Sequence, residues 1–239
     1  MGTLRWLDIL ISPVLFMRTQ AKRSPHLLMA VTIFSIFLIT KTVGQYLIFN
    51  SMLSHLPPSI QSDLGWAHFG FSISLVAGGI SDIVFWILGA GILVCLAILL
   101  DGMGEYRKLL ELTGCGHLPL ALFGLATLVF AISYNPDLHF TAYEDTDFHE
   151  LRKNNPTAFE RAMENIEKKL VQETSSQTFS AFRAAKHCAT LWSVILFILA
   201  LMESFQLTAL RSTFAVMGIV LLYILLEVVR QMLVSGKGI

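Results

Sequence analysis

The sequence predicts an all-α membrane protein: a polytopic helical bundle with about five transmembrane helices, an N-terminal interfacial helix, and one polar helical segment between spans three and four. Hydrophobic residues make up 54% of the 239 residues and charged residues 14%, and the mean hydropathy is +0.65. A soluble domain of this length does not need so much apolar surface to fill its core. We therefore expect the excess to face lipid.

Charge and cysteine content exclude several classes of function. The formal net charge is zero, so the chain has no basic surface of the kind that binds nucleic acid, and no nucleic acid partner is expected. Its three cysteines, Cys95, Cys115 and Cys188, are not at metal-ligand spacing and are interpreted as small hydrophobic residues. The N-terminus does not have the pattern of a secretory signal, because Asp8 and Pro13 interrupt its apolar stretch.

Five segments are apolar enough and long enough to cross a bilayer, which takes about twenty residues for a hydrocarbon core of about 30 Å. They are residues 27–49, 80–100, 117–134, 190–208 and 213–234. Residues 64–77 are also apolar, but the segment is short and ends at Gly78 and Gly79. We expect a re-entrant or interfacial helix there, with a sixth span as the alternative. These segments divide the chain into 1–25, 26–134, 135–187 and 188–239.

The first segment, residues 1–25, is expected to form a helix that lies along the membrane surface. Its apolar side chains recur at helical spacing, with charged residues elsewhere on the helix. They are Leu4, Leu7, Ile11, Val14 and Met17. Pro25 and the basic residues before it favour a helix that is separate from the first span.

Residues 135–187 hold most of the polar side chains. Asn155 as N-cap and Pro156 as first helical residue predict the start of an amphipathic helix, in which Glu164 precedes Lys168 by one turn. The apolar stripe of this helix needs a surface to pack on, which would be the membrane bundle, a partner or a second copy of the chain. We interpret it as a partner-binding stripe made of Phe159, Met163, Ile166 and Leu170, together with Ala162.

Residues 104–119 read GEYRKLLELTGCGHLP, and this stretch resembles the Yip family of multi-pass proteins, named for their interaction with Ypt/Rab GTPases. In that family a glycine-rich, basic link leads into a glycine-containing turn and then a proline that opens the third span. The motif residues here are Gly104, Tyr106, Arg107, Gly114 and Pro119. Ser12 and Pro13, followed by a basic stretch, resemble the opening of bacterial members. The chain departs from the family in having Cys115 where an aromatic residue is usual, and in its long polar segment.

The resemblance implies a function without catalysis. It implies a prokaryotic-type membrane scaffold or adaptor that binds protein partners of the transport or trafficking machinery, in the inner membrane and without a cofactor. The expected partners are the lipid bilayer and other membrane proteins or a second copy of the chain. The N-terminus is expected in the cytoplasm and the C-terminus outside.

Three charges lie inside predicted spans, where an unpaired ion is costly. They are Lys41, Glu203 and Glu227. They can be a structural ion pair that fixes helix order, or part of an ion path in a small transporter or in an accessory subunit of one, such as an ABC-type exporter. Five spans place Lys41 and Glu227 at one depth, whereas six place Lys41 beside Glu203. The distribution of basic residues alone favours six, while the resemblance favours five.

Chemistry-bearing side chains elsewhere support no active site. Glu144, Asp145, Asp147, His149 and Glu150 offer oxygen and imidazole ligands, but without EF-hand spacing, and a solvated acidic turn with Thr146 as helix cap is the simpler interpretation. His68, His117 and His187 border apolar runs and are expected near the headgroups. Because no hydrolase or nucleotide-binding motif is present, we predict no catalytic residue, metal or cofactor, and an intramembrane enzyme is the weakest alternative.

Overall fold

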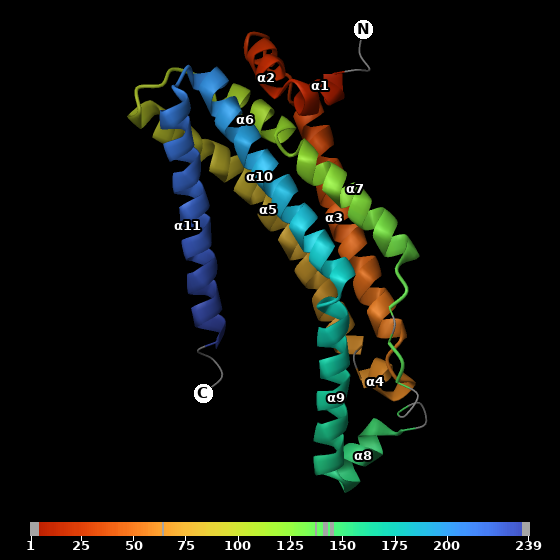
Figure 1. Ribbon diagram of the computed structural model, residues 1–239. Helices are drawn as coiled ribbons and strands as arrows, with labels where there is room; N and C mark the ends of the chain where they lie inside the picture. The colour runs from red at the N-terminus through yellow and green to blue at the C-terminus, as the bar shows by residue number, and fades with distance from the viewer. Residues whose placement is uncertain (1–4, 64, 137, 141–142, 144–145, 236–239) are drawn as a thin grey trace. The chain divides into compact units, whose positions relative to one another are not determined.

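The computed structural model describes residues 5–63, 65–136, 138–140, 143 and 146–235, with the backbone alone at 5–7, 62–63, 65–68, 223–224 and 226–235 (Figure 1). Within these ranges every regular element is a helix, which confirms the predicted all-α class. The helices are α1 (Arg5–Ile11), α2 (Pro13–Ala21), α3 (Leu27–Ser54), α4 (Pro58–Asp63), α5 (Gly65–Leu99), α6 (Tyr106–Cys115), α7 (Leu118–Ser133), α8 (Phe148–Asn154), α9 (Pro156–Thr174), α10 (Gln177–Phe205) and α11 (Ala209–Ser235).

The helices form two compact units made of non-consecutive segments. The first comprises Met1–Ile36, Ser81–Ala121 and Ala189–Ile239, and the second Phe37–Ile80 and Leu122–Cys188. The four helices α3, α5, α7 and α10 each contribute to both units.

Four stretches of the described residues are long and apolar enough to cross a membrane: Leu27–Ser54, Phe69–Leu99, Tyr106–Ser133 and Gln177–Phe205. In α11 the described apolar part is Ala209–Leu222, within a helix of 27 residues. These elements agree with the predicted polytopic helical bundle of about five spans. Many of their large apolar side chains are exposed, as a lipid-facing surface requires.

The short helix expected at residues 64–77 is not a separate element. Helix α5 runs without interruption from Gly65 to Leu99, a single ribbon in Figure 1. Gly78 and Gly79 do not end it, because no glycine in the described ranges has a positive φ, and a glycine with helical φ only weakens a helix. A continuous helix crosses a bilayer once, so a sixth span at these residues has no helix of its own.

The N-terminal segment is two helices instead of the single one expected. Helix α1 ends at Ile11, Ser12 takes a non-helical conformation with φ −138° and ψ 61°, and Pro13 begins α2. The break has a clear cause: proline has no N–H to donate and disfavours helical geometry in the residue before it. Of the expected stripe, Ile11 and Val14 are exposed and Met17 is fully buried. Leu4 and the side chain of Leu7 lie outside the described residues.

Helix α9 begins as predicted. Asn155 caps it by accepting a hydrogen bond from the Ala158 N–H, Pro156 is its first residue, and Lys168 forms an ion pair with Glu164 at 2.7 Å. This neighbouring ammonium holds the pKa of the exposed Glu164 carboxyl below its usual range. The expected end of the polar segment at residue 187 is not a helix boundary, because α10 continues through it.

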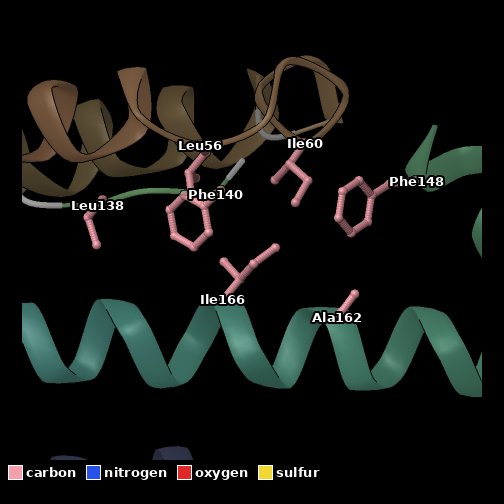
Figure 2. Close-up of a cluster of buried hydrophobic side chains, with 7 residues drawn as sticks. All are labelled: Leu56, Ile60, Leu138, Phe140, Phe148, Ala162 and Ile166. Atoms are coloured by element: carbon pink, nitrogen blue, oxygen red, sulfur yellow. The ribbon is translucent and has the colours of Figure 1, made fainter. Parts of the chain in front are cut away.

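The inner face of α9 packs on the second unit's own core. Figure 2 shows Ala162 and Ile166 of α9 facing Leu56, Ile60, Leu138, Phe140 and Phe148. Phe159 and Leu170 pack against this cluster at its edge. At the same end of the unit, the Tyr134 hydroxyl donates to Glu173 at 2.8 Å and the Lys169 ammonium to the carbonyl oxygen of His139. The polar segment is therefore a folded part of this unit.

Candidate functional site

A buried carboxylate at the centre of the first unit is the most organised polar site in the described chain. Glu111 of α6 is fully buried and accepts three hydrogen bonds. They come from the Lys108 ammonium at 3.0 Å, the Gln20 side-chain amide at 2.7 Å and the His26 backbone N–H at 3.1 Å. Because an uncompensated buried charge is costly, this complete set of donors is what allows the carboxylate to stay buried.

The three donors belong to three different parts of the chain. Lys108 lies one turn before Glu111 on α6, Gln20 is near the end of α2, and His26 precedes the first residue of α3. The site therefore connects α2 and the start of the first span to α6. We call this site a structural tie, because donors from three parts of the chain bind one carboxylate and so hold those parts together.

Two glycines of the Yip-like motif, one before α6 and one within it, allow the backbone to approach its neighbours closely. A Cβ atom at Gly114 would lie 2.6 Å from the Cβ of Ala30 and 2.7 Å from a ring carbon of Trp86. At Gly104 it would lie 2.1 Å from the carbonyl oxygen of Ser204. Both distances are shorter than any real Cβ contact, so these positions need glycine for packing. Backbone flexibility does not explain them, since neither residue has a positive φ.

The other motif residues have separate positions in this unit. The Tyr106 hydroxyl donates to the carbonyl oxygen of Ile87 at 3.0 Å, and the Arg107 side chain is exposed. Pro119 is the second residue of α7, where the helix does not require its missing N–H. None of the five motif residues touches Glu111 through a described hydrogen bond or ion pair, although Lys108 and Glu111 lie inside the motif sequence.

Glu203, predicted as an intramembrane charge, pairs with Arg18 of α2 at 3.4 Å. The Glu203 side chain is 17% exposed and that of Arg18 58%. This contact supports the interpretation of Glu203 as part of a structural ion pair, and Arg18 was not among the partners considered from the sequence. It is a second connection of α2 to the rest of the unit, beside that of Gln20.

His117 is a packing residue in this structure. Its ring lies 4.9 Å from the ring of Phe34 and 5.0 Å from that of Phe197, measured between centroids. Its Nδ1–H donates to the carbonyl oxygen of Thr113 at 2.9 Å. A ring fixed on several sides is not arranged to shuttle protons. The side chain of His68 lies outside the described residues, and His187 is exposed on α10.

The structure does not test the predicted pairing of Lys41 with Glu227. Lys41 of α3 belongs to the second unit, where its ammonium lies 5.6 Å from the centroid of the Phe37 ring. Glu227 lies on α11, but its side chain is outside the described residues. The pairing of Lys41 with Glu227 therefore stays a prediction.

The stripe predicted to bind a partner is divided by the structure. Ile166 is buried in the second unit's core, and Phe159 and Leu170 pack at the edge of it. These three side chains are therefore covered by other residues of the same chain. The sequence alone had left open whether the chain's own bundle, a partner or a second copy covers them. Met163 is 37% exposed and is the member of the stripe that faces outward most.

The acidic turn does not form a metal site in the described residues, among which no group of three or more metal-binding side chains is found. Asp147 is the helix cap: its carboxylate accepts from the backbone N–H groups of His149 and Glu150 at 2.9 and 3.0 Å. The cap expected at Thr146 is therefore one residue further along. Glu144 and Asp145 lie outside the described residues.

Sequence reasoning missed the two residues at the centre of the site. Lys108 and Glu111 look like an ordinary surface pair at i, i+3 spacing, and such pairs are usually exposed. The available signal was their position on an amphipathic helix between the motif glycines Gly104 and Gly114, which require close packing on both sides.

Comparison with known proteins agrees with this architecture. The family model described as the Yip1 domain matches residues 7–229. The chain is 26% identical over 125 residues to an uncharacterized protein of the archaeon Methanocaldococcus jannaschii, covering 52% of this chain and 86% of that protein. No solved structure matches the chain. The match extends over nearly the whole chain, including both ties of α2 and the close-packed Gly104 and Gly114: the protein is an integral membrane protein that belongs to the Yip1 domain family.

Proposed function

We propose that this protein is a non-enzymatic membrane scaffold or adaptor that binds protein partners of the transport or trafficking machinery. The observation that carries the non-enzymatic part of the proposal is how two carboxylates of the first unit are used. Glu111 accepts three hydrogen bonds from its own chain, and Glu203 pairs with Arg18. A proton path or a catalytic acid requires a carboxylate that a substrate or water can reach, and Glu111 is fully buried.

The outward face of α9 is the best-formed surface for a partner. The inner face of this helix is occupied by the second unit's core, whereas Glu160, Glu164 and Lys168 are exposed on the opposite side. Val171 is 56% exposed on the same side, and Met163 borders it. Non-obligate interfaces are about as polar as the rest of a protein surface, so a mixed face of this kind is compatible with a contact that assembles and separates. Family membership gives no partner's identity, so the surface defines only the chemistry.

The proposed location is a prokaryotic inner membrane with the N-terminus in the cytoplasm and the C-terminus outside. An odd number of crossings, with α5 counted once, supports opposite sides for the two ends.

Site-specific photo-crosslinking in native membranes tests the proposal. A photoreactive amino acid at the position of Glu164 should give a discrete adduct with one companion protein, identified by mass spectrometry. The matched control places the same amino acid at Lys153, which is exposed on α8, where no adduct with that companion is expected. The proposal is wrong if the protein crosslinks to nothing at Glu164 and moves a solute by itself after reconstitution.

A further inference from the structure

A small hollow is lined by residues of α1, α2 and the turn after α2, and it shares only Gln20 with the Glu111 site described above. Its volume is about 200 Å³. The residues that line it are Asp8, Ser12, Leu15, Phe16, Thr19, Gln20 and Arg23. All of them lie in the first unit, and the hollow includes the serine of the Ser-Pro pair that the family resemblance singled out.

The lining offers two opposite charges and two hydroxyl groups. Among the side chains that the structure describes, no hydrogen bond or ion pair engages the Asp8 carboxylate or the Arg23 guanidinium. Ser12 occupies the N-cap position of α2, yet its hydroxyl makes no capping hydrogen bond. A serine at that position normally caps the helix, so its hydroxyl is left available to a ligand in the hollow.

The surroundings of the hollow place it at the boundary between water and hydrocarbon. Ile11, Val14 and Leu15 are exposed beside it by 74%, 46% and 65%, and the first span begins at Leu27, shortly after Arg23. Large exposed apolar side chains next to charged ones, just before a span, are typical of a segment at the depth of lipid headgroups.

We infer that this hollow binds the headgroup of a phospholipid that carries both a phosphate and a primary ammonium group, as phosphatidylethanolamine does. The Arg23 guanidinium matches a phosphate, and the hydroxyls of Ser12 and Thr19 are additional donors. The Asp8 carboxylate accepts from the ammonium group. The acyl chains then lie along the exposed apolar side chains of α2.

Charge complementarity selects this headgroup over its competitors. Phosphatidylglycerol has no ammonium group and would put its phosphate near an unpaired Asp8. Phosphatidylcholine has an ammonium group, but its three methyl groups leave no N–H to donate and add bulk to a hollow of about 200 Å³. This inference does not depend on the proposed scaffold function, because it concerns a lipid and not a protein partner.

Competitive lipid retention tests the inference. The full-length protein is purified in detergent with an equimolar mixture of the three lipids, and the lipids that remain bound are quantified by native mass spectrometry. Phosphatidylethanolamine should be retained about tenfold over phosphatidylglycerol, the ratio expected for one charge-assisted hydrogen bond. Asp8→Asn should abolish or reverse this preference and Asp8→Glu should keep it, whereas Arg23→Gln should reduce the retention of all three lipids.

Two matched controls and one competitor complete the experiment. Glu150→Gln and Lys153→Gln on α8 each remove one exposed charge, of the same sign as Asp8 and Arg23 respectively, and should leave lipid retention unchanged. The melting temperature of each variant shows whether it is folded. Unchanged lipid order in folded Asp8→Asn, or a preference for phosphatidylglycerol in the unmodified protein, would overturn the inference. Displacement of the lipid by an equal concentration of soluble glycerophosphoethanolamine would overturn the assignment to a membrane lipid.

Discussion

Truncating Ile166 to alanine should open the polar segment of the second unit. Ile166 is only 3% exposed, so the substitution removes three carbon groups from a buried position, at about 0.8 kcal/mol each. The transfer term is thus about 2.4 kcal/mol, and the cavity left between α9 and Phe140 places the total within the range of about 2–5 kcal/mol. Met163→Ala, one turn away on the same helix and partly exposed, should cost less than about 1 kcal/mol.

Hydrogen exchange measured by mass spectrometry on the detergent-solubilised protein is the appropriate assay. A loss of about 2.4 kcal/mol raises the population of the locally open state about 50-fold, so the amides of α9 should exchange faster by that factor in Ile166→Ala. The amides of α6 in the first unit serve as the internal control and should be unaffected. If Ile166→Ala and Met163→Ala accelerate exchange in α9 equally, the assignment of Ile166 to the core of this unit is wrong.

Three further predictions concern the first unit and the topology. Lys108→Met should destabilise the protein by about 3–5 kcal/mol in thermal unfolding, because Glu111 stays buried without its ammonium partner. The double variant Lys108→Met with Glu111→Leu should recover much of that loss. A single variant with unchanged stability would contradict the structural role of the pair. Gly114→Ala should cost about 1–3 kcal/mol of stability by overpacking. Gly89→Ala, with no neighbouring atom near its added Cβ, should be neutral or slightly stabilising. Similar melting temperatures for the two variants would refute the close approach of α6. A C-terminal tag should lie on the non-cytoplasmic side of the membrane, and a double-mutant cycle should show coupling of Lys41 with Glu227. A cytoplasmic tag would contradict five crossings.

The parts of the fold that could be predicted are those set by local sequence. Asn155 and Pro156 determine where α9 begins, because a cap and a fixed φ act within one turn. The apolar runs likewise determine where the spanning helices lie, because composition and length alone decide whether a segment suits a bilayer.

Helix boundaries were predicted wrongly where the same residues can either end a helix or lie within one. Gly78 and Gly79 suggested a helix boundary, but glycine ends a helix only when its backbone leaves the helical region, and here it does not. At Ser12 and Pro13 the sequence was expected to continue as one helix, but the segment forms two helices because proline disfavours helical geometry in the residue before it. The candidate site was harder to predict, since the burial of Glu111 depends on Gln20 and His26, which are distant in sequence.

The Yip1 similarity and the glycine contacts together indicate where functional residues should be sought. Gly104 and Gly114 are needed because backbone or side-chain atoms fill the space that a Cβ would occupy, so the motif preserves the packing of α6 and does not form a reactive group. Residues that a fold needs for packing say little about what the protein binds. The informative positions are those with polar groups that packing leaves unused, namely Asp8, Ser12 and Arg23 in the hollow and the charged outward face of α9. Substitutions at these positions change recognition at little cost in stability, so loss of binding in a variant with a normal melting temperature separates a functional surface from a structural one.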